Sequence, residues 1–429
     1  MRTPELVIPG GSIEAVRVAL LYGADAVYVG LPDRSLRTQA KLTFNDAIAA
    51  RELTRKRGKR LYIAFNIFSH NRDLRELPEI IETIDEINPD GLIVADPGIF
   101  RRIQAALPGL ALHVSTQANI CSTATVEFWR DMGAAACVLA REVPFADIRE
   151  IRKDCPDVRL EMFVHGAMCM SYSGRCLISS YLTGRSANRG RCTQSCRWSY
   201  TLHEAIEPRQ YALEEAKRPG ERMPIIEDER GTYLMSSKDL CLIRRLPQII
   251  ECGIDMLKVE GRTKSPHYVA VVTRAYRAAL DAYANDPDGF DFRAYAAELN
   301  TLQHRGYTEA FFDGLPGPDA QTYDTPASTS DWRTAGFVRT HHEDGLTFEL
   351  RNTVKTGDVI ELLTPGGLET VSLQLSPLLC AQTRAPITQR AAGQHHAIYL
   401  PAAHLPQDWR TTCPVLTHAR KRYDGTCPG

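Results

Sequence analysis

Four cysteines lie close together in one basic stretch of the chain. The segment 163–200, FVHGAMCMSYSGRCLISSYLTGRSANRGRCTQSCRWSY, contains four cysteines and five arginines and no acidic residue. The cysteine spacing is C-x6-C-x15-C-x3-C, formed by Cys169, Cys176, Cys192 and Cys196. In a reducing compartment, thiolates this close repel one another unless a cation shares them. The spacing therefore predicts a bound metal ion or cluster.

The irregular spacing bears on which metal these thiolates would bind. Structural zinc sites usually take two C-x2–4-C pairs, and only Cys192 and Cys196 fit that pattern. Iron–sulfur clusters accept irregular spacing. The spacing therefore favours a [4Fe-4S] cluster and leaves a zinc ion as the alternative.

Arginines and aromatic residues surround these cysteines. The arginines are Arg175, Arg185, Arg189, Arg191 and Arg197. Aromatic residues such as Tyr181 and Trp198 lie among them. Guanidinium groups pair with phosphates and aromatic rings stack on unpaired bases, so this composition is typical of a loop that binds single-stranded RNA. The alternative is that the arginines compensate the negative charge of a thiolate-ligated cluster, and the residues alone leave both interpretations open.

The composition indicates a globular protein. The chain has 429 residues, of which 44% are apolar and 24% charged, and a formal net charge of -1. No segment approaches the roughly 18 apolar residues that a membrane helix needs, and the first residues lack the apolar core of a secretory signal. We therefore expect a cytoplasmic protein with no membrane partner. The small net charge means that any nucleic-acid site must come from local clustering of charge.

Strand and helix patterns alternate along the first 286 residues. Eight short β-branched runs occur at 5–11, 25–30, 59–66, 90–97, 110–117, 135–142, 159–166 and 255–262. Most are followed by a helix-length amphipathic stretch. Repeated strand–helix units are typical of a parallel sheet, and eight of them most simply close into a β/α barrel. We predict an α/β fold with an eight-stranded, TIM-like barrel, with an open doubly wound sheet as the alternative.

The chain outside the barrel divides into an insertion and a C-terminal region. The insertion after the seventh strand, 167–235, carries the cysteines, and loops that follow strands lie on the catalytic face of a barrel. We expect it to overhang the barrel mouth, and SSKDLCLIRRLPQIIECG (236–253) to form the next helix. A helical link and linker should follow at 287–332. Alternating hairpin patterns then predict a small antiparallel β-barrel domain at 333–402, with a tail at 403–429.

Several motifs resemble those of a known family. The stretch EMFVHGAMCMSYSGRCLIS (161–179) is similar to the signature of peptidase family U32, the collagenase-like peptidases. The likeness extends through YLMSSKDL (233–240), LKVEGRTKSP (257–266) and HRGYTEAF (304–311), so it covers essentially the whole chain. Within the family, the resemblance is greatest to the bacterial branch that makes 5-hydroxyuridine at the wobble position of tRNA. That branch uses prephenate, rather than dioxygen, as the hydroxyl source.

The resemblance implies a cofactor, a reaction and partners. It assigns a [4Fe-4S] cluster to the four clustered cysteines, with Cys241 as the reserve ligand in place of Cys196. It implies oxygen-independent, prephenate-dependent 5-hydroxylation of the wobble uridine, with tRNA, prephenate and an electron donor as partners. The alternatives are hydroxylation of a ribosomal RNA and a collagenase-like peptidase. A peptidase fits poorly, because the chain has no H-E-x-x-H or G-x-S-x-G motif and cysteines that bind iron cannot act as nucleophiles.

Polar residues at the ends of the predicted strands should point into the barrel mouth. Prephenate carries two carboxylates, which call for guanidinium or ammonium partners. We expect substrate binding by Arg141, Lys258, Arg37, Gln117 and Asn66, catalysis by Glu260, Arg262 and His165, and RNA binding by the five arginines and Trp198. The alternative for Glu260 and Arg262 is a structural salt bridge, and for His165 a hydrogen-bonded position at a strand end.

Overall fold

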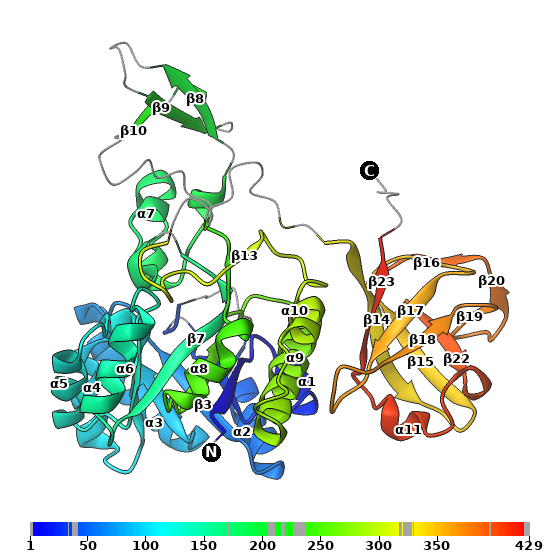
Figure 1. Ribbon diagram of the computed structural model, residues 1–429, viewed down its shortest axis with the longest axis horizontal. Coiled ribbons are helices and arrows are strands. Elements are labelled where there is room, and N and C mark those ends of the chain that lie inside the picture. Colours follow the sequence, from blue (N-terminus) through cyan, green and yellow to red (C-terminus); the bar gives the residue numbers. More distant parts are fainter. Residues whose placement is uncertain are drawn as a thin grey trace.

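Eight parallel strands form a closed barrel in the computed structural model (Figure 1). They are β1 (Glu5–Pro9), β2 (Ala26–Gly30), β3 (Arg60–Phe65), β4 (Gly91–Val94), β5 (Leu112–Val114), β6 (Ala136–Val138), β7 (Arg159–Ala167) and β12 (Met256–Val259). The strands follow one another in chain order, and β12 closes the barrel by pairing with both β1 and β7. The predicted TIM-like barrel is confirmed. The structure describes residues 3–32, 34–36, 42–169, 171–198, 200–204, 211–215, 219–220, 222–225, 237–316, 320, 328, 330–393 and 396–423.

Helices cover the outside of the barrel. They are α1 (Ile13–Leu21), α2 (Phe44–Lys56), α3 (Asn71–Ile87), α4 (Pro97–Ala106), α5 (Thr123–Asp131), α6 (Phe145–Asp154), α8 (Leu246–Glu251) and α9 (Pro266–Asn285), followed by α10 (Arg293–Leu299). A Ser or Thr hydroxyl caps several of them, as at Ser12, Thr43 and Ser265, because it accepts a hydrogen bond from an otherwise unpaired N–H of the first turn. No described helix is long and apolar enough to cross a membrane.

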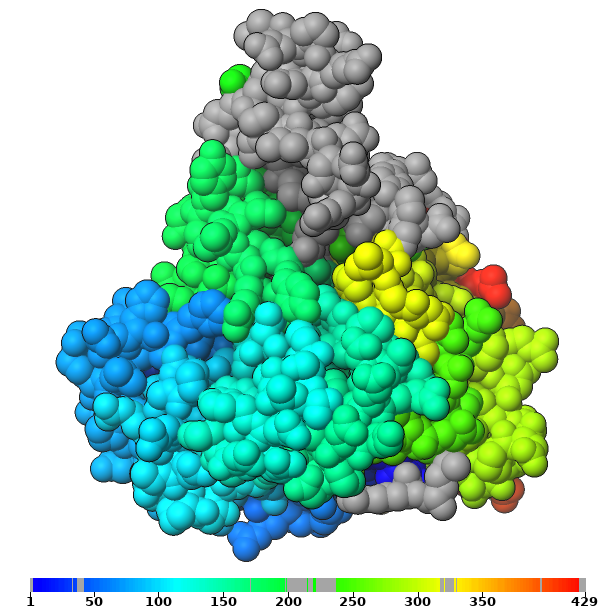
Figure 2. All heavy atoms as spheres, turned by 60° about the vertical axis from the view of Figure 1, so that its left-hand side comes forward, coloured from blue at the N-terminus to red at the C-terminus, as the bar shows by residue number. Residues whose placement is uncertain are grey.

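The cysteine-rich insertion leaves the barrel at the end of β7. Its described elements are the 3-10 turns η2 (Tyr172–Gly174), η3 (Ala187–Arg189) and η4 (Ser195–Arg197), the helix α7 (Ile178–Thr183), and the strands β8 (Tyr200–Glu204), β9 (Tyr211–Glu215) and β10 (Arg222–Ile225). Figure 2 shows its green atoms standing above the blue and cyan barrel. The insertion lies over the carboxyl ends of the strands, as predicted.

The segment after the insertion differs from the predicted helix. Asp239–Cys241 forms a strand, β11, which pairs antiparallel with the end of β7 and parallel with β13 (Tyr307–Thr308). The helix α8 begins only at Leu246. The apolar residues Leu240, Leu242 and Ile243 are all buried, and a short apolar run of this kind does not distinguish a strand from a helix by its periodicity.

An ion pair fastens the insertion to the barrel. The Arg189 guanidinium donates to both oxygens of Asp73 at 2.9 and 3.0 Å and to the Phe68 carbonyl oxygen at 3.0 Å. The Asp73 side chain is only 1% exposed. Burial alone would raise its pKa, but hydrogen bonds from Arg189 and from the His70 N–H lower the pKa of Asp73 to about 2. This paired carboxylate holds the turn at η3 against the start of α3.

The C-terminal region forms an antiparallel half-barrel of eight strands. Its strands are β14 (Trp332–His341), β15 (Gly345–Leu350), β17 (Val359–Leu363), β18 (Thr370–Gln374), β19 (Leu378–Cys380), β20 (Pro386–Ile387), β22 (Ala397–Pro401) and β23 (His418–Arg422), and β16 (Val354–Lys355) pairs with β21 (Gln389–Arg390) beside it. The stretch from 403 that the sequence suggested was a tail contains α11 (Trp409–Thr412) and β23, which lies inside the sheet between β14 and β17. Its short, basic sequence, HARKR, carries little apolar signal for a strand.

The half-barrel packs against the β/α barrel through buried contacts. Leu363 of β17 belongs to the same apolar core as α1 and α9. The Tyr22 hydroxyl, at the end of α1, donates to the Leu363 carbonyl oxygen at 2.8 Å and accepts from the His418 N–H at 3.0 Å. Arg274 of α9 donates to the carbonyl oxygens of Gly367 and Glu369. Buried hydrogen bonds therefore join the two units.

Replacing Tyr22 with Phe tests this contact. The change should lower the free energy of unfolding by about 2–4 kcal/mol, because it leaves a buried carbonyl and a buried N–H unpaired. Chemical denaturation of the variant and the unchanged protein measures the difference. Tyr181→Phe is the control, since Tyr181 is 81% exposed and should change stability by less than about 0.5 kcal/mol. Equal effects of the two changes would contradict the assigned role of Tyr22.

Replacing Asp73 with Asn tests the anchor of the insertion. A carboxylate whose pKa is depressed from about 3.9 to about 2 on folding contributes roughly 2 kcal/mol at neutral pH, and the contribution is lost as pH falls from about 4 to about 2. The variant should therefore be less stable at pH 7, and the difference should shrink in acid, where the native carboxylate becomes protonated. Denaturation at pH 7 and pH 3 measures this. Asp131→Asn is the control because the ion pair of Asp131 with Arg130 is exposed. If the loss of unfolding free energy in Asp73→Asn were the same at both pH values, the assigned role of Asp73 would be wrong.

Candidate functional site

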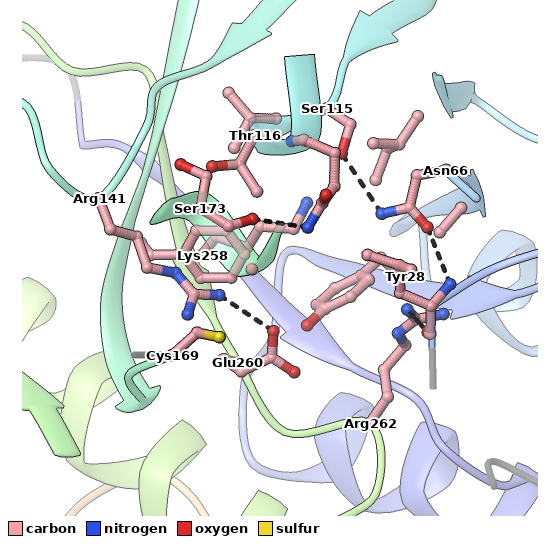
Figure 3. A pocket seen from close by; sticks show the side chains of 17 residues that line it. Tyr28, Asn66, Ser115, Thr116, Arg141, Cys169, Ser173, Lys258, Glu260 and Arg262 are labelled. Carbon is pink, nitrogen blue, oxygen red and sulfur yellow. Dashed lines mark hydrogen bonds and ion pairs between the residues drawn. The ribbon is translucent and has the colours of Figure 1, made fainter. Parts of the chain in front are cut away.

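A pocket opens at the carboxyl ends of the barrel strands (Figure 3). We call it the central pocket. Its lining residues come from strand ends around the barrel and from the insertion: Tyr28, Leu36, Ala64, Asn66, Ile93, Ser115, Thr116, Gln117, Val138, Arg141, Phe163, Cys169, Ser173, Gly174, Lys258, Glu260 and Arg262. Active sites of TIM barrels lie at this end.

Two ion pairs lie in and beneath the central pocket. The Lys258 ammonium is 2.8 Å from Glu161, whose side chain is fully buried inside the barrel, and it lies over the Tyr28 ring. The Arg141 guanidinium donates to Glu260 at 3.1 Å and lies over the Phe163 ring. Each cation therefore contacts one carboxylate and one aromatic face, and these two contacts fix its position.

Arg262 is the third cation of the pocket. Its side chain is buried and donates to the Ser35 hydroxyl and to the Leu36 carbonyl oxygen. Gly30 makes room for it, because a Cβ added at Gly30 would lie 2.1 Å from an Arg262 nitrogen. The sequence left a Glu260–Arg262 salt bridge as an alternative to a catalytic role; in the structure the Glu260 carboxylate pairs with Arg141.

Amide side chains form another wall of the pocket. The Asn66 carboxamide accepts from the Leu36 N–H at 3.2 Å and donates to the Ser115 hydroxyl at 3.3 Å. The buried Gln117 carboxamide donates to the Ser173 carbonyl oxygen at 2.6 Å, which joins the barrel to the insertion. Its own oxygen is buried and has no hydrogen-bond donor in the described structure. Gln117 thus presents an acceptor for a donor that a ligand can supply.

A second hollow lies next to the central pocket, and four thiols line it. We call this space the cysteine hollow. Its lining residues include Cys169, Cys176, Cys192 and Cys196. Cys176 is buried, and the Gln194 N–H donates to the Cys192 sulfur at 3.4 Å. Among the described residues, no three Cys, His, Asp or Glu side chains are gathered around one point where a single metal ion would sit. All four thiols therefore border the same space.

Cys241 does not line the cysteine hollow. It lies in β11 opposite His165, and burial raises the pKa of its thiol to about 11. The structure places Cys196, and not Cys241, beside the other three cysteines.

The two spaces share a wall. Cys169, Gly174 and Glu260 line both the central pocket and the cysteine hollow. Figure 3 shows the Cys169 side chain beside the Arg141–Glu260 pair. Gly174 has φ +80°, and a Cβ there would lie 2.9 Å from the Gln117 carboxamide, so a glycine is required for this close approach. A group bound by the four thiols would therefore lie next to a ligand in the central pocket.

The predicted RNA-binding arginines fall into two groups. Arg189 is used within the protein by Asp73, and Arg175 donates to the Gln117 carbonyl oxygen at 2.6 and 3.0 Å. Arg185 and Arg191 are exposed on the insertion, and Trp198 is half-buried. The Arg197 side chain lies outside the described residues. The first group organises the insertion, whereas the second faces solvent above the barrel mouth.

His165 does not enter the central pocket, contrary to the prediction. It is buried among Tyr268, Tyr276 and Tyr307, and burial lowers its pKa to about 3. The register between β12 and β7 shifts after the Lys258–Phe163 pair, so that β7 contains an extra residue before His165. Such a bulge reverses the alternation of side chains, and it turns His165 away from the mouth. Arg37, another predicted residue, lies outside the described part of the chain.

Sequence reasoning missed several residues of the site. Glu161 and Phe163 precede His165 at alternate positions of β7 and point into the barrel; period-two alternation from a buried strand could have identified them. The same alternation along β2 could have identified Tyr28. Lys264, which lines the cysteine hollow, follows β12 in a loop, and no local pattern indicates it.

Comparison with known proteins agrees with the sequence motifs. The sequence model of peptidase family U32 matches residues 11–322. The chain is 37% identical to tRNA hydroxylation protein P of Escherichia coli (strain K12), over 97% of each chain. It is 38% identical to tRNA hydroxylation protein P1 of Bacillus subtilis (strain 168), over 85% of this chain and 84% of that one. It is also 32% identical to a 23S rRNA 5-hydroxycytidine synthase of Escherichia coli (strain K12), over 75% of this chain and 47% of that one. The chain therefore belongs to peptidase family U32.

Proposed function

We propose that the protein is an iron–sulfur tRNA hydroxylase that forms 5-hydroxyuridine at the wobble position, with prephenate as the hydroxyl source. The observation that carries this proposal is the shared wall between the cysteine hollow and the central pocket. It would place a redox-active group next to the central pocket. The relatives named tRNA hydroxylation proteins, which match over most of the chain, support tRNA as the substrate.

The donor set of the cysteine hollow supports a [4Fe-4S] cluster. Zinc would need its four sulfurs about 2.3 Å from one point, whereas a four-iron cluster takes one thiolate at each of its irons and so needs them spread around a larger body. The four thiols line one hollow. Cys169, Cys176, Cys192 and Cys196 would hold the cluster, which would supply electron transfer or Lewis-acid chemistry at the wall of the pocket.

The charges of the central pocket support a dianionic substrate. Lys258, Arg141 and Arg262 all line this pocket, where Lys258 pairs with Glu161 and Arg141 pairs with Glu260. A ligand with two carboxylates, such as prephenate, can pair with guanidinium groups in fork geometry. The aromatic rings of Tyr28 and Phe163 line the same space and offer an apolar surface to its ring.

Glu260 is the residue suited to proton transfer. Hydroxylation at C5 replaces a C–H bond with a C–OH bond, which removes two electrons and a proton from the uridine; the hydroxyl donor would accept the two electrons, and a base at the site must take the proton. The Glu260 carboxylate faces both spaces, and Arg141 orients it through one oxygen. We assign proton transfer to Glu260 and ligand orientation to Arg141 and Arg262.

The structure gives no support to the peptidase named in the family title. A cysteine peptidase needs a histidine beside its nucleophile. Among the described residues, no histidine lines either the central pocket or the cysteine hollow, and His165 is enclosed by tyrosines.

Metal content and a cysteine variant test the cluster. Protein purified without air should contain about four irons and four acid-labile sulfides per chain, as a [4Fe-4S] site requires. Cys176→Ser should lose the cluster, because a serine hydroxyl is not ionised at neutral pH, and tRNA from cells with only this variant should lack 5-hydroxyuridine and its derivatives by nucleoside mass spectrometry. Cys155→Ser is the control, since Cys155 is equally buried but caps α6. Zinc without sulfide, or unchanged nucleosides in a strain with no other hydroxylation route, would refute the proposal.

Replacing Arg141 with Lys tests the prephenate site. Lysine keeps the charge but loses the planar fork that binds a carboxylate through two hydrogen bonds. The KM for prephenate should rise by roughly tenfold, which corresponds to about one charge-assisted hydrogen bond, while iron content stays unchanged. Steady-state hydroxylation of tRNA at varied prephenate measures this. Arg244→Lys is the control, because Arg244 also lies over an aromatic ring, that of Phe292, but outside the pocket; a prephenate KM equal to that of the unchanged protein would count against Arg141.

A further inference from the structure

A polar groove runs between the β/α barrel and the C-terminal half-barrel. Residues from the loop after β12, from the segment after α10 and from β14 line it, and they include Lys264, Ser265, Gln303, Trp332, Arg333 and Asn352. Among the described residues, no carboxylate lines this interdomain groove. It combines cations, amide groups and an indole, which are the side chains that contact phosphates and bases in RNA.

Arg333 lines this groove, and Arg422 lies beside the groove residue Trp332. Arg333 donates to the carbonyl oxygens of Ser330 and Trp332, and its guanidinium lies 4.4 Å from the Tyr423 ring. Arg422 is exposed, lies opposite Trp332 in the sheet, and has its guanidinium 5.0 Å from the Trp332 ring. Neither arginine forms an ion pair with a described carboxylate.

The neighbouring cations of β23 are neutralised, which makes Arg422 distinct. Arg420 pairs with Glu298 at 2.8 Å and with Glu361 at 2.9 Å. Lys421 pairs with Asp358 at 2.8 Å. Two of the three cations in this strand therefore form ion pairs within the protein. The third, Arg422, is exposed to solvent beside the groove.

The groove borders the candidate active site. Lys264 lines both the interdomain groove and the cysteine hollow, and Glu260 lines both the hollow and the central pocket. The Tyr268 hydroxyl, in the groove wall, donates to the Glu260 carbonyl oxygen at 2.8 Å. In Figure 1 the start of β14 and the end of β23 lie on the same side of the molecule as α7, and α11 lies at the opposite end of the half-barrel.

We propose that the interdomain groove binds the tRNA strand next to the target uridine, through phosphate contacts from Lys264, Arg333 and Arg422. This inference rests on the proposed function, because the strand must continue from a nucleotide at the central pocket. The C-terminal half-barrel thereby acts as part of the substrate site and not only as a support for the barrel. An acidic peptide would satisfy the same charges, but the position of the groove favours RNA, because the groove borders the cysteine hollow and the hollow borders the central pocket.

The double variant Arg333→Ala, Arg422→Ala tests the groove. Its dissociation constant for an unmodified tRNA transcript should rise by about tenfold or more, and the slope of log affinity against log salt should fall by about 1 to 2, as expected for two lost phosphate contacts. Fluorescence anisotropy with cluster-loaded protein, at several KCl concentrations and without air, measures both quantities. The salt slope separates phosphate contact from a structural role, which would leave it unchanged.

Arg410→Ala is the matched control. Arg410 is exposed and lies over the Trp409 ring at 4.5 Å in α11, as Arg422 does over Trp332, but on the far side of the half-barrel. It should keep the affinity and slope of the unchanged protein, and Arg333→Lys, Arg422→Lys should keep most of the slope. Three outcomes would overturn the groove assignment if the unchanged protein still hydroxylates tRNA. The alanine variant could keep the salt slope of the unchanged protein, or the control could lose as much tRNA affinity as the alanine variant. The third outcome is that the two arginines are needed to bind poly-glutamate but not to bind tRNA. Failure of the unchanged protein to bind tRNA would instead overturn the proposed function.

Discussion

The pairing of β12 with both β7 and β1 is the constraint on which the site depends. Backbone hydrogen bonds on both sides of this short strand close the barrel and fix the residues that follow it. Lys258 therefore lies opposite Phe163, and the loop after the strand brings Glu260 to Arg141 and Arg262 to the loop at Ser35. Without this closure, these residues would lie on separate segments with no common pocket.

Charge compensation gives the central pocket its character. Taking an ammonium or guanidinium group out of water is costly unless a carboxylate or hydrogen bonds repay it. Lys258 forms an ion pair with Glu161, and Arg141 forms one with Glu260. Arg262 donates hydrogen bonds to a hydroxyl and to a carbonyl oxygen. Three cations therefore line one pocket, and their positive charge favours an anionic ligand.

The same residues connect three spaces that the fold could have kept apart. Glu260 lies between the central pocket and the cysteine hollow, and Lys264 lies between the cysteine hollow and the interdomain groove. Both follow β12, so a single loop of the barrel borders all three. Such an arrangement suits a macromolecular substrate, since one nucleotide can reach the reacting groups while its neighbours stay on the surface.

The amino-acid sequence determined the barrel, the basic cysteine-rich insertion and the four thiols that we assign to a cluster. Strand–helix alternation and the spacing of Cys169 to Cys196 are local signals, and local signals survive without knowledge of the packing. It also indicated most of the polar residues at the strand ends, because the end of a strand in a barrel is a position that periodicity predicts.

Only the tertiary structure decided how those residues are used. A bulge in β7 turned His165 away from the pocket, Asp73 took Arg189 as an internal partner, and β23 entered a sheet that its basic sequence did not predict. The partners of each charge come from segments far apart in the chain, as Lys258 and Glu161 do. Their distance and burial, which set each pKa and each ion pair, are properties of packing that no local pattern contains.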